Sequence, residues 1–217
     1  MTENEEIRDR VHALASRITE LSAELAALGR RKEFEQELHD RGNWLAKGST
    51  TVPPWAEKWN EYWDGLRKDP THIALVTEYE SVKAKLHSPE FESAIDGMKS
   101  GDAAGAEYAV AYLEADPWFF RSGYLKGTIA RRLRRVELSA GQQERLRSAL
   151  LAAIAKGSRF EFVEYRKLAR RVETPEFRNE LRRLSESRDT GIARRAGLTL
   201  RFCEMNDTPG RDLRGAR

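Results

Sequence analysis

The stretch IRDRVHALASRITELSAELAAL, residues 7–28, decides the fold class because its apolar residues recur at alternating spacings of four and three. This is the heptad pattern of a helix with one apolar stripe. The a positions are Val11, Ile18 and Leu25, and the d positions are Ile7, Leu14, Leu21 and Leu28. β-Branched residues at a with Leu at d favour a parallel two-stranded coiled coil. We therefore predict one long heptad helix over residues 1–41.

The flanks of the stripe leave two arrangements open. The e positions after Arg8 are Ala15, Ser22 and Gly29, which cannot form salt bridges across a two-stranded seam. Small residues at these positions widen the stripe and suit packing against more than one helix. The seven a and d residues therefore either hold a homodimer together or pack against their own chain in a bundle.

Residues 42–54, GNWLAKGSTTVPP, predict a linker, because Gly, Ser, Thr and a Pro-Pro pair cannot sustain a helix. The chain from residue 55 to residue 205 then shows a series of short helical patterns. Each has a start signal in which Ser, Thr or Asp caps the helix or Pro occupies its first turn. These signals are Asp69-Pro70, Ser88-Pro89, Asp102, Asp116-Pro117, Ser139 with Gln142, Ser158 with Glu161, Thr174-Pro175 and Asp189.

No stretch alternates with the period of two that marks a half-buried strand, so the predicted class is all-α. The polar tail over residues 206–217 is predicted to be disordered. Apolar residues make up 40% of the 217, which is enough for a core. The N-terminus lacks a secretory h-region, no apolar run is long enough to span a bilayer, and Cys203 stands alone. We therefore expect a cytoplasmic protein that does not engage a membrane.

The charge is divided unevenly along the chain. Residues 1–117 hold 14 Lys/Arg and 23 Asp/Glu, a net charge of −9, whereas residues 118–217 hold 24 Lys/Arg and 12 Asp/Glu, a net charge of +12. The helical array is thus acidic over residues 55–117 and basic over residues 118–205. Such asymmetry indicates an anionic partner. It equally permits the acidic half to lie against the basic half.

The basic half concentrates its arginines in short runs, and doublets recur every 12 residues at 170–171, 182–183 and 194–195. If their helices stack with one face in common, the arginines form a basic strip that could neutralise phosphates. The alternative is a solvated face or a protein-facing surface. The candidate anion-binding residues are Arg131, Arg132, Arg134, Arg135, Arg166, Arg170, Arg171, Arg178, Arg182, Arg183, Arg194 and Arg195.

The end of the basic half resembles a HEAT repeat over residues 177–203. Leu181 and Leu184 precede a turn at residues 187–190, and Ile192, Ala196 and Leu200 follow it. Asp189 stands where such repeats often carry Asp before their second helix, but Ala193 stands where Arg is common. The resemblance implies an α-solenoid of antiparallel helix pairs that binds protein or nucleic acid.

Aromatic, histidine and cysteine residues carry no catalytic pattern. Trp55, Trp59 and Trp63 recur at helical spacing, which is typical of a core face, although an aromatic patch for a partner is the alternative. Residues 118–120, Trp-Phe-Phe, are expected to plug the core. Glu35 and His39 are too few for a metal site, and Cys203 is interpreted as a buried structural thiol.

We expect a binding or scaffold protein rather than an enzyme, with no cofactor and no metal, because no phosphate-binding glycine loop or catalytic constellation is present. Its basic array would engage an anionic partner, with nucleic acid first and an acidic protein second. The alternative is a protein-protein adaptor or assembly component that self-associates through Ile7, Val11, Leu14, Ile18, Leu21, Leu25 and Leu28.

Overall fold

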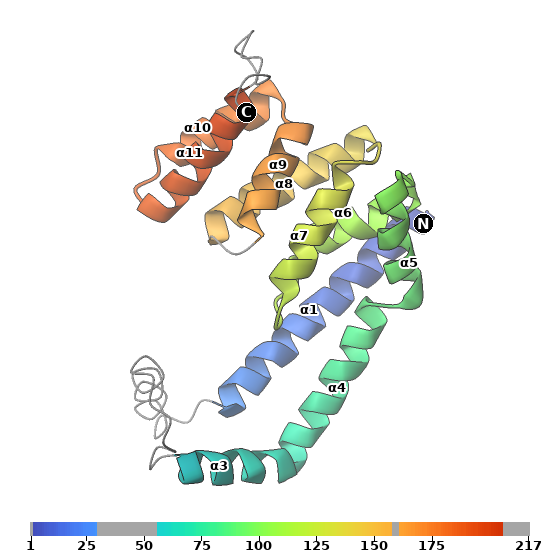
Figure 1. Ribbon diagram of the computed structural model, residues 1–217, viewed down its shortest axis with the longest axis vertical. Helices are drawn as coiled ribbons and strands as arrows, with labels where there is room; N and C mark the ends of the chain where they lie inside the picture. Colours follow the sequence, from blue (N-terminus) through green and yellow to red (C-terminus); the bar gives the residue numbers. More distant parts are fainter. Residues whose placement is uncertain (1, 30–55, 158–160, 206–217) are drawn as a thin grey trace, which may run out of the picture.

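The computed structural model describes residues 2–29, 56–157 and 161–205, and within them it is all-α, with ten α-helices, two 3-10 turns and no strand (Figure 1). The predicted linker and tail lie outside these residues, as does the predicted extension of the first helix beyond Gly29. The helices are α1 (Glu3–Gly29), α3 (Ala56–Lys68), α4 (Pro70–Leu86), α5 (Pro89–Gly97), α6 (Ala106–Ala115), α7 (Ser122–Leu133), α8 (Ala140–Lys156), α9 (Phe162–Val172), α10 (Pro175–Ser185) and α11 (Thr190–Glu204).

Most helix start signals are confirmed, and the caps give the physical reason. The side chains of Asp69, Ser88, Thr174 and Asp189 each accept hydrogen bonds from backbone amides in the first turn that they precede. Ser139 forms the predicted capping box with the residue three positions later. These bonds satisfy donors that the helix cannot satisfy itself.

Three start signals have other outcomes. Asp102 caps the 3-10 turn Ala103–Gly105, which leads into α6, rather than α6 itself. Asp116-Pro117 was expected to open a helix, but Asp116 lies in the left-handed region at φ 45° and ends α6, so that α7 begins only at Ser122. Glu161 was expected to complete a capping box with Ser158. Ser158 lies outside the described residues, and Glu161 is instead buried at the start of α9 with no capping hydrogen bond from its side chain.

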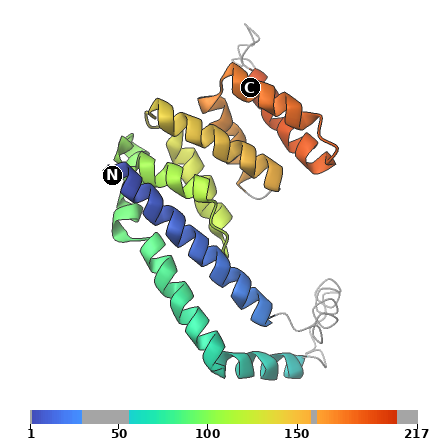
Figure 2. The same ribbon diagram turned by 180° about the vertical axis from the view of Figure 1, so that it is seen from behind.

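The apolar stripe of α1 packs within the chain, against α4 and α6 (Figures 1 and 2). Val11, Ile18 and Leu21 are buried there, and the Arg17 guanidinium bonds Glu78 of α4 at 2.7 Å. Of the two arrangements that the sequence left open, the stripe is therefore used in the intrachain one. Self-association through the same residues stays a prediction that would require α1 to leave these contacts.

The six helices from α6 to α11 lie in two rows (Figures 1 and 2). One row packs α6 on α8 and α8 on α10, and the other packs α7 on α9 and α9 on α11. Consecutive helices also pack on each other across the rows, α6 on α7, α8 on α9 and α10 on α11. Buried residues from both rows join one core, including Tyr112, Ile129, Leu146, Leu168 and Leu181.

The aromatic residues are less deeply buried than expected. Of residues 118–120, only Phe119 plugs the core; Trp118 is 44% exposed and Phe120 is 82% exposed. The expectation of a three-residue plug is therefore wrong. On α3, Trp63 lies beside Gly29 at the end of α1, and the Tyr62 hydroxyl donates to the Leu28 carbonyl. Trp55 and the side chain of Trp59 lie outside the described residues.

None of the described helices is both long and apolar enough to cross a membrane.

Candidate anion-binding surface

The predicted arginine strip is not one continuous surface, because half of its twelve members are engaged within the chain. Five of them pair with carboxylates. The sixth, Arg195, donates from Nε to the Ile154 carbonyl at the end of α8 at 2.7 Å. The carboxylate pairs are Arg134 with Glu164, Arg178 with Glu173, Arg182 with Glu204, Arg183 with Glu180 and Arg132 with Asp96.

The 12-residue repeat of doublets therefore does not place all three doublets in one row of helices. Arg182 and Arg183 lie on α10, in the other row from Arg170 and Arg171 of α9. Arg194 is exposed at the start of α11, where no ion pair to a described residue involves it, and Arg131 and Arg135 are likewise exposed near the end of α7.

Five residues do come together as a basic cluster, which we define as Arg134, Lys167, Arg170, Arg171 and Phe202. They line one surface depression of about 480 Å³ and come from the end of α7, from α9 and from α11. The row in which α9 packs on both α7 and α11 explains why residues distant in sequence meet here.

An aromatic ring stands at the centre of these cations. The guanidinium carbons of Arg170 and Arg166 lie 5.7 and 5.9 Å from the centroid of the Phe202 ring. These are cation–π distances, and they hold the two arginines beside the cluster without neutralising their charge. Neither arginine forms an ion pair with another described residue.

The cluster keeps an excess of positive charge. Glu164 bonds Arg134 at 2.9 Å and Lys167 at 3.1 Å, so one carboxylate is shared between two cations. In addition, the Nε atoms of Arg134 and Arg166 are buried without an acceptor. Buried donors without acceptors are unfavourable, so an anion that reached them would relieve an existing cost.

Two of these positions were not among the predicted site residues. Lys167 stands within the same helical run as the predicted arginines and could have been included on that ground. Phe202 gave no signal in the sequence, since its role depends on the packing of α11 against α9.

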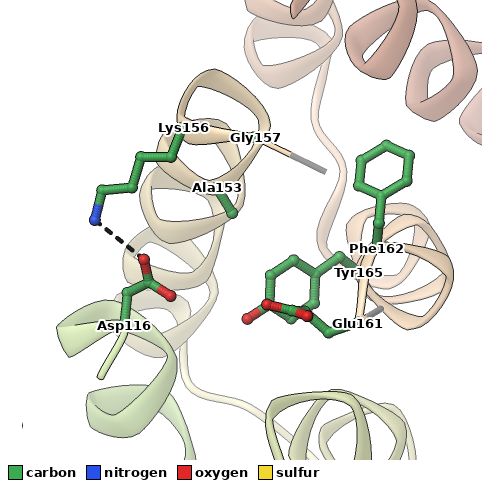
Figure 3. Close-up of a pocket in the computed structure, with 7 residues that line it drawn as sticks. All are labelled: Asp116, Ala153, Lys156, Gly157, Glu161, Phe162 and Tyr165. Atoms are coloured by element: carbon green, nitrogen blue, oxygen red, sulfur yellow. Dashed lines mark hydrogen bonds and ion pairs between the residues drawn. The ribbon is translucent and has the colours of Figure 1, made fainter. Parts of the chain in front are cut away.

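A second group of charges surrounds the Asp116 carboxylate, and Figure 3 shows its ion pair with Lys156. The Asp116 carboxylate accepts from Lys126 at 2.5 Å and from Lys156 at 3.1 Å, and the Lys126 side chain is fully buried. Across the same small cavity, Glu161 and Tyr165 lie together in Figure 3. Oε2 of Glu161 is buried and has no hydrogen-bond partner within residues 2–29, 56–157 and 161–205.

The burial of Cys203 is consistent with the structural thiol that the sequence predicts. Cys203 lies on α11 and is 1% exposed. Burial, reinforced by the nearby Glu173 carboxylate, raises the pKa of the Cys203 thiol to about 12. The thiolate, which is the reactive form, is therefore scarce at neutral pH.

Comparison with known proteins identifies no relative: no family model, no curated protein and no solved structure matches this chain.

Proposed function

We propose that this chain is a non-enzymatic binding protein whose basic cluster engages an anionic partner, a nucleic acid before an acidic protein. The observation that carries the proposal is the set of cations around Phe202. Arg166, Arg170 and Arg171 add three charges that no described carboxylate neutralises, beside two cations that share Glu164.

Phosphate suits this cluster better than an isolated carboxylate does. Guanidinium groups present planar, paired donors that match phosphate oxygens, and several cations in one depression can neutralise neighbouring phosphates of a backbone. The half-buried Phe202 adds an apolar surface between the arginines. A depression of this kind favours contact with the backbone rather than reading of base edges.

We further propose that α6 to α11 form a HEAT-like solenoid of three helix pairs, α6 with α7, α8 with α9 and α10 with α11. The two rows of packed helices support this interpretation. In such an array one row supplies a continuous surface, and the basic cluster spans neighbouring helices of the row that contains α7, α9 and α11.

The test is fluorescence anisotropy with labelled duplex DNA, single-stranded DNA and RNA at about 50 and 200 mM salt. We expect binding at the lower salt that weakens steeply at the higher salt. The double variant Arg170→Glu, Arg171→Glu should lower affinity and make the salt dependence shallower by roughly two units of slope, because two phosphate contacts are lost.

The matched control is Arg182→Glu, Arg183→Glu, which changes the net charge equally at two arginines that already pair with Glu204 and Glu180. This control should retain most of the binding. Equal losses in the two double variants would show that only overall charge matters and would refute the cluster. Absence of binding to all three nucleic acids at about 50 mM salt would refute the nucleic-acid proposal.

A further inference from the structure

Glu161 lines the small cavity of Figure 3 and also a larger depression, whose walls are mainly aromatic and apolar. We call it the aromatic groove; its volume is about 540 Å³. Phe120 and Tyr124 are 82% and 57% exposed at its rim. Volumes of this size are typical of sites that take a ligand or a partner side chain. The lining residues used below are Leu25 of α1, Tyr79 of α4, and Trp118, Phe120, Tyr124 and Glu161.

The loop that carries Trp118 and Phe120, residues 116–121, is held by contacts to α7 and α1. Asp116 and Arg121 both have positive φ values, 45° and 67°, which are unfavourable for residues with a side chain. The buried pair of Lys126 with Asp116 holds one end, and the Trp118 amide donates to Thr19 Oγ1 of α1 at 3.1 Å. A loop held this firmly loses little entropy when a partner binds to it.

Glu161 indicates which kind of ligand the aromatic groove favours. Its side chain lines the groove, is almost fully buried, and has one carboxylate oxygen that accepts no hydrogen bond from the residues that the structure describes. Gly123 is what allows this placement, since a Cβ at position 123 would lie only 2.6 Å from Oε2. A buried carboxylate without a partner is strongly unfavourable, and a cation is the group that would compensate it best.

The aromatic walls suit the same partner. Ring faces attract ammonium and guanidinium groups, and the Arg121 guanidinium already lies 5.2 Å from the Phe120 ring centroid. Arg121 is exposed, so its own charge is screened by solvent, whereas the field of the buried Glu161 carboxylate is not. The balance inside the groove therefore favours a cation over an anion.

We propose that the aromatic groove binds a lysine or arginine side chain of a partner polypeptide. The aliphatic stem would lie between Trp118 and Tyr124, and the charged end would reach the Glu161 carboxylate. The exposed rim formed by Phe120 suits the apolar residues that flank such a side chain in a peptide. This proposal is independent of the basic cluster, which lies on α7, α9 and α11.

The test uses the full chain labelled with ¹⁵N and follows the Gly123 amide and the Trp118 indole N–H during titration. The probes are Ac-Ala-Lys-Ala-NH2 and the same peptide with norleucine, which has the stem of lysine without the ammonium group. We expect the lysine peptide to bind at least roughly tenfold more tightly than the norleucine peptide. Glu161→Gln should remove this preference, and Gly123→Ala, which displaces the carboxylate, should weaken it.

The matched control is Glu92→Gln, which removes an exposed carboxylate of α5 and should keep the preference for lysine. Thermal melting and nucleic-acid binding of the Glu161 variant check that it folds. Equal binding of the two peptides would overturn the proposal, as would the absence of shifts at about 10 mM peptide. If n-butylamine binds as tightly as the lysine peptide, the groove takes small amines rather than a partner chain, and the proposal also fails.

Discussion

Arg145 of α8 and Arg170 of α9 lie on neighbouring helices, yet their surroundings are opposite. Arg145 donates to Glu107 at 2.6 Å and to Glu114 at 2.9 Å. Burial acts to lower the pKa of Arg145, but the hydrogen bonds that it donates to Glu114 and Glu107 outweigh this effect and raise the pKa overall. Arg170 instead lies beside a phenylalanine ring among other cations. The same residue type is neutralised in one place and has no described carboxylate partner in the other.

The difference follows from which helix each arginine meets. α8 packs on α6, which belongs to the acidic half of the chain, so Arg145 of α8 pairs with two carboxylates of α6. Arg132 and Lys126 also pair across the halves, with Asp96 and Asp116. Part of the positive charge of the second half is therefore neutralised by carboxylates of the first half. Helix α9 packs on the basic helices α7 and α11, and its arginines Arg166, Arg170 and Arg171 have no described carboxylate partner.

The largest effect is expected for Arg145→Met. Removing this guanidinium leaves the nearly buried Glu107 with Gln142 as its one side-chain donor among the described residues. Breaking a buried pair in this way costs about 3–5 kcal/mol of unfolding free energy. Urea denaturation measures the loss. The control is Arg183→Met, which breaks an exposed pair and should cost less than about 1 kcal/mol. Equal losses would abolish the distinction between the buried and the exposed arginine pairs.

A smaller effect of opposite sign is expected for Glu161→Gln. This carboxylate is buried and one of its oxygens lacks a partner, so neutralising it at constant shape should stabilise the fold by about 1 kcal/mol. The measurement is the urea midpoint at unchanged m-value. A loss of stability would mean that the charge is compensated in the fold, which would remove the basis for a cation in the aromatic groove.

The smallest effect concerns the pH dependence of stability. Burial beside Phe91 and Phe119 disfavours the imidazolium form and lowers the pKa of His87 below 6.5. The unfolded chain therefore takes up a proton at a higher pH than the folded chain does, and stability falls as the pH drops below about 6.5. The fall should end once the pH passes the lower pKa of the folded state.

Urea midpoints at pH 7.5 and 5.5 measure this effect, with the pH values chosen on either side of about 6.5. Between these two pH values, the urea midpoint of His87→Phe should fall less than that of the original chain. The midpoint of His72→Gln should fall as much as that of the original chain. A pH dependence that is unchanged in His87→Phe would assign the effect to other groups.

Local signals in the sequence predicted most of the fold. The heptad stripe of α1 and the caps Asp69, Ser88, Thr174 and Asp189 gave helices where the structure has them, because these effects act within one or two turns. The start of α7 was missed. A left-handed Asp116 is held there by Lys126, ten residues later, and a local pattern does not contain that contact.

The candidate sites were less predictable for the same reason. The arginine runs marked both α9 and α10 as carriers of cations. They did not distinguish α9, where Arg170 has no described carboxylate partner, from α10, where Arg182 and Arg183 meet carboxylates. The aromatic groove was missed because Trp118 and Phe120 are apolar, and apolar residues are expected inside.

The sequence by itself determined that this protein is helical, where most of its helices begin, and that its second half carries the surplus of arginine. Periodicity, capping and net charge are properties of neighbouring residues, so they can be found without a structure. Only the tertiary structure decided which charges are compensated. Compensation depends on the partner within a few ångströms, and for Arg145 and Arg132 that partner comes from another helix.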